Sequence, residues 1–376
     1  MKFRVDRDQI SEAVVWVGRV IPSRSPQPIL CGIQIVATNN ELTLSGSDLD
    51  VRNREIVPAD VIEPGEIIIS GRLLADIVRA LPSAPVEFEV NGNRVEITCG
   101  RSVFSLQIMA TGDYPTPLEI PDATGTISAT DFTTAISQVG LAAAKNDFRH
   151  HLTGINFEID GPHIEIAATD GNRLAVKKLT WSPSNAKVST SALVPARYLT
   201  DIAKTLNSSE AVTLGLPQSS NEGIIGITAE PRQTTSRTIA SNFPAYKSLL
   251  EFEPTSIVQI NTAALIESIK RVSLVLEHNS PVGLRFENGE ACIFGAGGAG
   301  ERSEAKEFLE SSLSGEDITI GFYPHYLIEG LTALNAPVTE IQLTAPMKPA
   351  LFFGKDEVDG QNDESFQYLL LPRRMD

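Results

Sequence analysis

A glycine-rich run and a histidine pair are the first residues in this sequence whose types and spacing could support chemistry. Gly295–Gly300 matches Gly-x-Gly-x-x-Gly, which lets a backbone approach a dinucleotide pyrophosphate when a strand precedes it and a helix follows. The acidic segment 301–307 follows instead, so the pattern favours a turn, and a nucleotide-dependent enzyme stays an alternative. His150 and His151 are the only adjacent histidines, and no third ligand at a suitable spacing accompanies them.

Two aspartates complete the candidates for chemistry. Asp48 and Asp170 lie in turn-forming segments, where a carboxylate accepts hydrogen bonds from nearby backbone N–H groups. We expect them to cap turns rather than to act as general acids. The sequence contains no nucleophile elbow, P-loop or His-Glu-x-x-His motif. It therefore predicts a protein without a catalytic site, a cofactor or a metal.

Composition bounds the partners of the protein. Of its 376 residues, 42 % are hydrophobic, while 31 Lys and Arg against 47 Asp and Glu give a formal charge of -16. This balance excludes a polycation that coats nucleic acid with its whole surface, but it leaves a local basic face open.

The chain start and the cysteines predict the compartment. The first residues lack the apolar stretch of a signal peptide, and no apolar run approaches the ~20 residues of a membrane span. Cys31, Cys99 and Cys292 lie far apart, which indicates neither a disulfide framework nor a cysteine metal site. We expect a reduced cytoplasmic protein without a membrane partner.

Two helical patterns recur three times along the chain. The first places apolar residues along one helical face, in the sets Ile10, Val14, Val17, Ile21; Phe132, Ile136, Val139, Ala143; and Leu265, Ile269, Val272, Leu276. The second reads basic, x, Leu, x, acidic, and it occurs at 72–76, 197–201 and 325–329. Alternating segments such as 41–45 and 163–166 predict antiparallel strands between the helices. Repeats of about 125 residues therefore account for the whole chain.

Turn-forming residues near 121–125 and Pro254 set the predicted boundaries. They give three domains, residues 1–122, 123–253 and 254–376. The fold class predicted is α+β, with two helices and an antiparallel sheet in each domain.

Several stretches resemble one family, the bacterial DNA polymerase III beta subunit, which is the replicative sliding clamp. They are Met1–Phe3, Pro28–Leu30, Leu152–Glu158, Ala168–Ala175 and Tyr368–Met375. The resemblance spans the full chain and keeps the family's order. It implies the DNA clamp fold, in which a head-to-tail homodimer closes six domains into a ring around duplex DNA. Helices would line the channel and sheets would form the outside. Such a ring tethers the replicative polymerase, is opened by a clamp loader, binds other proteins carrying clamp-binding peptides, and catalyses nothing.

Cations at matching positions could let an acidic ring hold DNA. On the second helices, Arg72 and Arg79, and also Arg197 and Lys204, are seven residues apart and so share one helical face. The alternative is a set of solvated surface charges. The family resemblance adds Arg24, Arg149 and His150 to the DNA-binding residues, with contacts to phosphates rather than to base edges.

The resemblance also implies a pocket for partner peptides. Its walls are Leu152, Thr169, Gly171, Arg173, Leu174, Pro244 and Leu249 from the middle repeat, and Tyr326, Met347, Leu369, Leu371, Pro372 and Arg374 from the third. Arg173 and Arg374 are candidates to fix a peptide carbonyl or carboxylate.

Three residues depart from the family's pattern at the pocket, namely Asn172, Tyr323 and Arg373. They affect the peptide preference expected of the pocket. The plainer alternative is that Leu152, Leu174 and Leu369 are ordinary core residues.

For the dimer interface, the resemblance pairs Phe104 and Leu106 of the first repeat with Leu274 and Val275 of the third. A repeat scaffold that binds peptides without DNA remains the rival from another functional class.

Overall fold

The structure is a computed structural model, and it describes all residues except 111, 113, 117, 207–209, 218–222, 252, 298–302, 359 and 376. The chain forms two compact units. Unit 1 comprises Met1–Ala129, Pro183–Asn185 and Leu206–Thr238, and unit 2 comprises Thr130–Ser182, Ala186–Thr205 and Ile239–Asp376. The middle repeat contributes to both units because its strands pair with strands from each neighbouring repeat.

The described residues contain six α-helices, two in each repeat. They are α1 (Arg7–Val17), α2 (Gly71–Ala80), α3 (Ala129–Gly140), α4 (Ala196–Ala203), α5 (Thr262–Val272) and α6 (Pro324–Leu334). The predicted apolar stripes are buried within the helices, with Ile10, Phe132 and Leu265 fully inaccessible. Ile21 and Leu276, the last members of two stripes, are half-buried and lie beyond the ends of α1 and α5. None of these helices is both long enough and apolar enough to span a membrane.

Local chemistry explains where the helices begin. The Asp6 carboxylate accepts hydrogen bonds from the Asp8 and Gln9 backbone N–H groups, and so caps α1. Asn261 caps α5 in the same way, by accepting from the Ala264 N–H at 2.9 Å. Pro324 opens α6, where its missing N–H costs nothing because the first turn has no partner for it.

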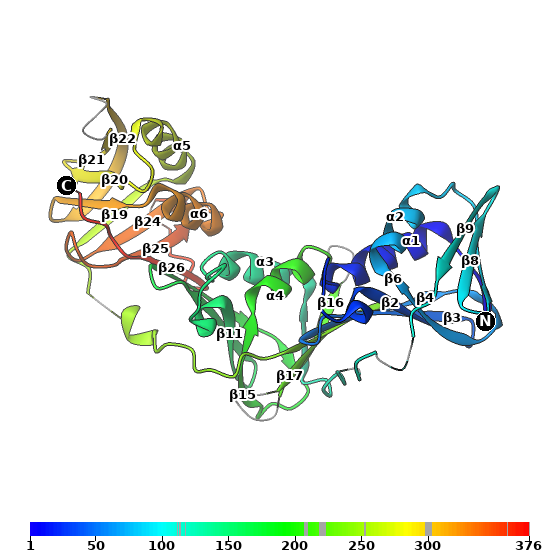
Figure 1. The fold of residues 1–376 in the computed structure, drawn as a ribbon. Coiled ribbons are helices and arrows are strands. Elements are labelled where there is room, and N and C mark those ends of the chain that lie inside the picture. Colours follow the sequence, from blue (N-terminus) through cyan, green and yellow to red (C-terminus); the bar gives the residue numbers. More distant parts are fainter. Residues whose placement is uncertain are drawn as a thin grey trace. The chain divides into compact units, whose positions relative to one another are not determined.

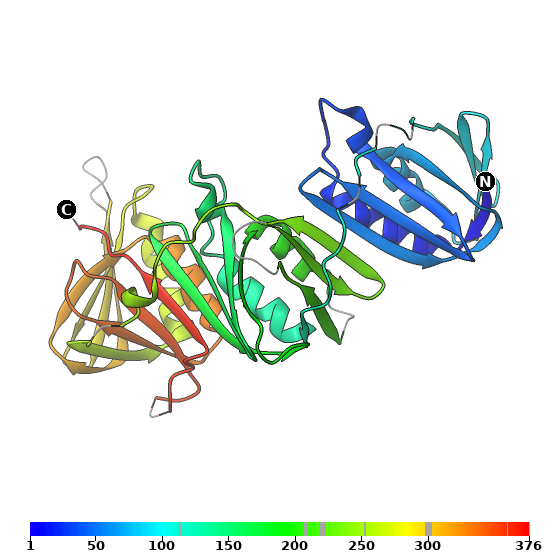
Figure 2. The same cartoon turned by 90° about the horizontal axis from the view of Figure 1, so that it is seen from below.

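Unit 1 contains two antiparallel sheets. The five-stranded sheet has the order β5 (Asp60–Glu63), β1 (Lys2–Val5), β7 (Val86–Asn91), β8 (Arg94–Cys99) and β9 (Ser102–Gln107). The nine-stranded sheet has the order β14 (Ser182–Pro183), β10 (Gly125–Ser128), β16 (Ala211–Gly215), β17 (Ile224–Ala229), β18 (Arg232–Arg237), β4 (Val51–Pro58), β3 (Glu41–Ser47), β2 (Gly32–Thr38) and β6 (Gly65–Ser70). Figures 1 and 2 show α1 and α2 together on one face of strands β2 to β4.

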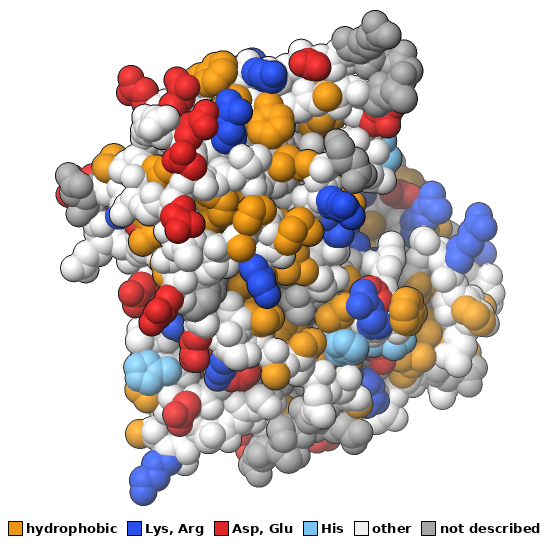
Figure 3. Space-filling model, turned by 90° about the vertical axis from the view of Figure 1, so that its left-hand side faces the viewer, with side chains coloured by type: hydrophobic (Ala, Val, Ile, Leu, Met, Phe, Trp, Pro, Cys, Tyr) orange, Lys and Arg blue, Asp and Glu red, His pale blue; other side chains and the backbone are white. Residues whose placement is uncertain are grey.

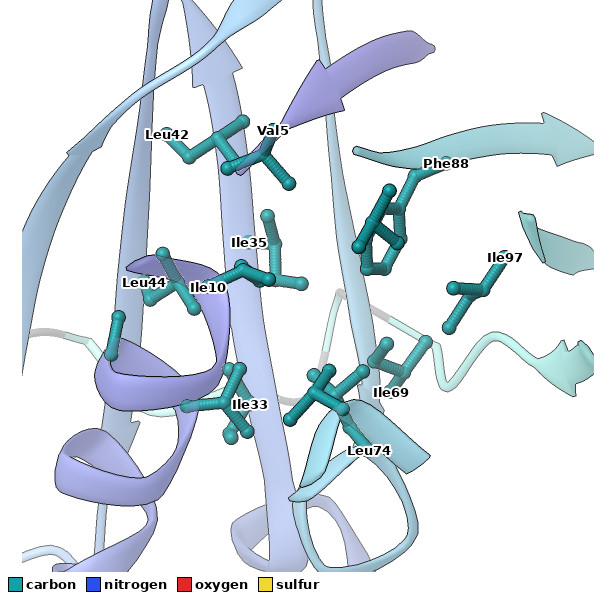
Figure 4. Packing of buried hydrophobic residues seen from close by; sticks show 14 of the residues in the cluster. Val5, Ile10, Ile33, Ile35, Leu42, Leu44, Ile69, Leu74, Phe88 and Ile97 are labelled. Atoms are coloured by element: carbon teal, nitrogen blue, oxygen red, sulfur yellow. The ribbon is translucent and has the colours of Figure 1, made fainter. Parts of the chain in front are cut away.

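The core of unit 1 lies between these helices and sheets. Figure 4 shows Ile10 of α1 and Leu74 of α2 pointing toward Ile33 and Ile35 of β2, with Phe88 of β7 closing the cluster. All five side chains are buried. Burying each of them stabilises the fold by about 2 kcal/mol, so the helices are held mainly by this packing.

Unit 2 is built on one long antiparallel sheet. Among the described residues its order is β15 (Ser189–Pro195), β11 (Gly154–Asp160), β12 (His163–Thr169), β13 (Arg173–Thr180), β26 (Phe366–Leu370), β25 (Ala350–Lys355), β24 (Val338–Leu343), β19 (Ser256–Asn261), β22 (Glu304–Gly315), β21 (Glu290–Ala296), β20 (Val282–Glu287) and β23 (Ile318–Phe322). The pairing of β13 with β26 joins the middle and third repeats. The predicted strands at 41–45 and 163–166 are therefore confirmed within β3 and β12.

Candidate peptide pocket and DNA-binding residues

The turn between β12 and β13 is held by its own side chains. The Asp170 carboxylate accepts hydrogen bonds from the Asn172 N–H at 2.8 Å and the Arg173 N–H at 3.2 Å. The Thr169 hydroxyl accepts from the Gly171 N–H at 3.1 Å and donates to the Arg173 carbonyl at 2.6 Å. Gly171 has φ +88°, in the left-handed region that glycine enters without strain. The predicted role of Asp170 as a turn cap is confirmed, and Asp48 caps its own turn by accepting from Asp50 and Val51.

Arg173 is tied to the third repeat by its guanidinium. The side chain is buried, and it donates to Asp170 at 3.0 Å and to Glu329 of α6 at 2.5 Å. Its guanidinium carbon lies 4.3 Å from the centroid of the Tyr326 ring. Two acids and the ring therefore engage this cation, and its predicted role in fixing a peptide carbonyl or carboxylate stays a prediction.

The leucines predicted for the pocket wall divide into buried and exposed sets. Leu174 and Leu369 are direct partners in the β13–β26 pairing and belong to one core cluster with Tyr246. Leu152 is also buried. The alternative that these three leucines are core residues therefore describes their packing, although a core residue can still form the floor of a pocket.

The other apolar wall residues present surface. Leu249 is 50 % exposed, Met347 61 % and Leu371 36 %, and Pro244 is also exposed. These residues come from separate segments, so their membership of one pocket with half-buried Pro372 and exposed Arg374 stays a prediction.

The predicted DNA-binding residues are exposed in both units. In unit 1, Arg72 and Arg79 lie on the exposed face of α2, opposite buried Leu74, and Arg24 is exposed in the loop after α1. In unit 2, exposed Arg197 and Lys204 line a hollow of about 790 Å³ between α3 and α4. Their seven-residue spacing does place each pair on one face. On the face shown in Figure 3, acidic side chains gather along one edge, so charge is unevenly distributed.

The loop 145–151 carries the other two predicted DNA contacts. His150 begins a 3-10 helix, His150–Thr153, and is exposed. Arg149 donates to Asp147 at 2.7 and 3.0 Å. These hydrogen bonds from the Arg149 side chain, with one from its backbone N–H, lower the pKa of Asp147 to about 2. The acid stays ionised, and the pair is neutral overall.

The predicted interface residues lie on the outer strand of one sheet and in the 3-10 turn after α5. Phe104 and Leu106 are on β9, the last strand of the five-stranded sheet, where Leu106 is buried and Phe104 half-buried. Leu274 follows α5 and is 84 % exposed, while the adjacent Val275 is half-buried. Leu274 therefore offers the larger free apolar surface.

The glycine run joins two antiparallel strands. Ala296 of β21 pairs with Glu304 of β22, and the Gly297 N–H donates to the Ser303 carbonyl at 2.7 Å. Gly298–Gly300 lie outside the described residues. The antiparallel strands on either side of the run do not form the βαβ frame that a dinucleotide site requires, which argues against the nucleotide-dependent alternative. Among the described side chains, no cluster of three or more His, Cys, Asp or Glu is placed to hold a metal ion.

Comparison with known proteins covers the chain from end to end. Models of the N-terminal, central and C-terminal domains of the DNA polymerase III beta subunit match residues 1–118, 126–245 and 247–374. The chain belongs to the DNA polymerase III beta subunit family.

Relatives and solved structures of this family agree over full length. The beta sliding clamp of Streptomyces coelicolor is 42 % identical over 376 residues, covering 100 % of both chains. The crystal structure of the Bacillus subtilis DNA polymerase sliding clamp matches with a TM-score of 0.92 at 27 % identity, over 100 % of this chain and 99 % of that one. The DnaN sliding clamp of Pseudomonas aeruginosa bound to griselimycin matches with a TM-score of 0.91 at 26 % identity, over 100 % of both chains. The three repeated domains predicted from the sequence are thus those of the clamp family.

Arg373 contacts both Asn172 and Tyr323, which the sequence alone did not reveal. Arg373 donates to the Asn172 side-chain oxygen at 2.5 Å, and its guanidinium carbon lies 4.5 Å from the Tyr323 ring centroid. The Leu371 N–H also donates to the Asn172 carbonyl at 2.9 Å. These contacts therefore fasten the C-terminal tail to the 169–173 turn. The resemblance predicts that these three residues depart from the family's pattern, and that prediction was the one signal in the sequence.

Proposed function

We propose that the protein encircles duplex DNA as a head-to-tail homodimer and tethers the replicative polymerase to its template. The observation that carries this proposal is the full-length match to the DNA polymerase III beta subunit family. The protein functions as a sliding clamp, with domains at 1–122, 123–253 and 254–376. Helices line the channel, sheets form the outer wall, and the protein performs no chemistry of its own. Because a clamp must reach the chromosome, we expect it in the cytoplasm.

Closure of the ring is proposed to use one free sheet edge in the first domain and one in the third. Within the described residues, β9 pairs only with β8, and the first part of β22, up to Glu310, pairs only with β21. Free edges of this kind readily accept another strand. Exposed Leu274 adds apolar surface to unit 2. We propose that the first domain of one protomer joins the third domain of its partner. Such a head-to-tail contact forms a closed two-subunit ring when the rotation that relates one protomer to the next is half a turn.

We expect the closed ring to keep the protein on DNA, with ionic contacts to the phosphates contributing less. The cations proposed for the channel are Arg24, Arg72, Arg79, Arg149, His150, Arg197 and Lys204, against a formal charge of -16 for the whole chain. Contacts between exposed cations and phosphates are screened by salt, with a Debye length of about 10 Å at 0.1 M. Retention on DNA therefore rests on topology.

The peptide pocket recruits the polymerase, the clamp loader and other partners. Leu249, Met347 and Leu371 supply exposed apolar surface, and Met is a deformable side chain that adapts to different peptides. Arg373 contacts Asn172 and Tyr323, and we place this polar link at the pocket's margin, where we expect it to affect the peptide preference.

The test compares closed and open DNA. The protein is loaded by its clamp loader onto nicked circular DNA, washed at high salt, and then treated with a nuclease that linearises the circle. We expect retention on circles and loss after linearisation; equal loss from both forms would contradict the proposal. The matched variant combines Leu274→Ala with Val275→Ala, which should shift sedimentation from twice 40.6 kDa toward the monomer and abolish retention. A wild-type monomer at every concentration would favour the peptide scaffold instead.

A further inference from the structure

A cavity of about 560 Å³ lies on the face of the nine-stranded sheet that points away from α1 and α2. Successive side chains of a strand point to opposite faces of its sheet. On β4, Asn53 points toward α1, since its side-chain amide donates to the Trp16 carbonyl at 3.3 Å. Its neighbours Arg52 and Arg54 point the other way and line the cavity. All the residues that line the cavity belong to unit 1.

The linker between the first and middle repeats forms one wall of this cavity, at residues 118–120. In Figure 1 the chain after β9 passes below the strands, on the side away from α1 and α2. The linker lies close to β17, because a Cβ added at Gly226 would be 2.5 Å from the Ile120 side chain. It is fastened to the sheet further along, where the Thr124 N–H donates to the Leu214 carbonyl at 2.7 Å. The cavity therefore has a sheet as its floor and a backbone segment held against that sheet as its wall.

Two buried polar atoms of the cavity have no hydrogen-bond partner among the described residues. They are the Thr235 hydroxyl oxygen and the Nε of Arg52. Thr235 is only 6 % exposed, and it is the direct partner of Arg52 in the pairing of β4 with β18. Side chains directly opposite each other on antiparallel strands have Cβ atoms about 5 Å apart, so both groups can reach one ligand. Because a buried polar group left unpaired costs stability, the pair indicates a site built for a ligand.

The charged side chains that line the cavity give it a net positive charge. Arg52 donates to the Ser45 hydroxyl at 2.9 Å, and Arg54 donates to the Gln233 side-chain oxygen at 3.1 Å. Within the described part of the chain, neither arginine forms an ion pair with an acid. Glu119 is the one acid among the described lining residues, and it is exposed, so solvent screens its charge. The two cations are therefore available to an anion.

The remaining lining favours a ligand with an apolar part. Val36, Leu118 and Ile120 contribute aliphatic side chains, and binding pockets of this size usually combine such a lining with a few polar groups. Guanidinium groups bind phosphate and carboxylate strongly. A phosphate monoester has three terminal oxygens and a charge near -2, whereas a carboxylate has two oxygens and a charge of -1. Donors that converge from two strands, beside a second guanidinium, fit the phosphate better.

We propose that this cavity binds a phosphate monoester that carries a small apolar or aromatic group. Arg52 and Thr235 hold the phosphate oxygens, and Arg54 adds positive charge beside them. Leu118 and Ile120 contact the apolar group. The site goes beyond the proposed clamp function, because neither ring closure nor the peptide pocket uses these residues. A bound ligand ties the linker to the sheet of unit 1.

The experiment titrates the full-length protein with phenyl phosphate, inorganic phosphate and benzoate by isothermal titration calorimetry. Phenyl phosphate should bind with a dissociation constant of about 0.1 to 1 mM, as expected for a ligand of its size. Inorganic phosphate lacks the apolar group, and benzoate lacks the third oxygen and the second charge, so each should bind about tenfold more weakly. Arg52→Gln removes the guanidinium and should weaken phenyl phosphate binding by about tenfold or more.

Two neighbouring threonines of β18 give a matched pair of variants. Thr235→Val removes the unpartnered hydroxyl and keeps the shape of the side chain. Phenyl phosphate should then bind about tenfold more weakly, while the urea midpoint of unfolding does not fall. Thr234 faces the other side of the sheet, where its hydroxyl donates to Asn53 at 2.8 Å. Thr234→Val should therefore lower the urea midpoint and leave the affinity for phenyl phosphate within about twofold of wild type.

Each alternative result overturns the inference. No detectable binding of phenyl phosphate by the wild type removes the site. Equal affinity of the wild type, Arg52→Gln and Thr235→Val would place the binding elsewhere on the protein. Benzoate that binds as tightly as phenyl phosphate would assign the cavity to carboxylates instead. A lower urea midpoint for Thr235→Val would show that this hydroxyl serves stability. None of these measurements uses DNA, so their outcome is independent of the clamp function.

Discussion

The two junctions where one repeat's sheet continues into the next share a backbone frame. In unit 1, β4 pairs with β18, and the Asp50 carbonyl accepts the Arg237 N–H at 2.8 Å. In unit 2, β13 pairs with β26, and the Asn172 carbonyl accepts the Leu371 N–H at 2.9 Å. Each junction follows an aspartate-capped turn with one residue in the left-handed region. The repeated fold therefore sets this geometry in both places.

Side chains make the two junctions different. In unit 1, the Thr234 hydroxyl donates to Asn53 at 2.8 Å, and Arg232 donates to buried Glu55 at 3.1 Å. Burial raises the pKa of the Glu55 carboxyl, and Arg232 opposes that rise. In unit 2, Leu174 and Leu369 meet instead. Polar pairs therefore lie across the strand pairing of the first junction, whereas the second combines a buried leucine pair with the polar link from Arg373 to Asn172.

The largest difference between the two junctions is expected when the residue that ends each turn is changed to alanine. This residue is Arg173 in unit 2 and Val51 in unit 1. Arg173→Ala leaves Asp170 without its cation and frees Tyr326, so the free energy of unfolding should fall by about 3 kcal/mol. Affinity for a fluorescent clamp-binding peptide should fall more than tenfold, because Tyr326, which we propose as a wall of the peptide pocket, loses its contact with the guanidinium. Urea denaturation and anisotropy measure the two quantities.

Val51→Ala is the matched change in unit 1. It removes buried methyl groups and should cost about 2 kcal/mol of stability, with peptide affinity unchanged. If both variants lose peptide affinity equally, the pocket depends on general stability, and the contrast between the junctions does not hold.

Periodicity predicted the helices and the repeats because apolar spacing is a local property of the sequence. The caps formed by Asp48 and Asp170 were predictable for the same reason, since their partners lie two and three residues away. The link from Arg173 to Glu329 was not, because 156 residues separate them and only the β13–β26 pairing brings their elements together. The contact of Arg373 with Asn172 likewise depends on the fold.

A smaller effect is expected from the capping aspartates. Asp48→Ala removes the acceptor for two backbone N–H groups and should cost about 1 kcal/mol. Asp170→Ala removes the same two bonds and also the partner of Arg173, so about 2 kcal/mol is expected. Asp170→Asn keeps an acceptor for the N–H groups but removes the charge. Its loss of stability should therefore lie between about 1 and about 2 kcal/mol. Equal losses for the two alanine variants would show that the Arg173 ion pair contributes little to stability.

The smallest effect concerns the left-handed residue of each turn, Gly171 at φ +88° and Leu49 at φ +83°. Gly171→Ala should cost about 1 kcal/mol, and backbone strain alone accounts for this, because an added Cβ would meet only the Arg149 side chain at 3.8 Å. Leu49→Gly relieves similar strain but gives the unfolded chain more freedom, so its net change should stay within about 0.5 kcal/mol. Paired urea denaturation curves measure both values. A loss well above about 2 kcal/mol for Gly171→Ala would mean that the turn in unit 2 carries contacts beyond the frame it shares with unit 1.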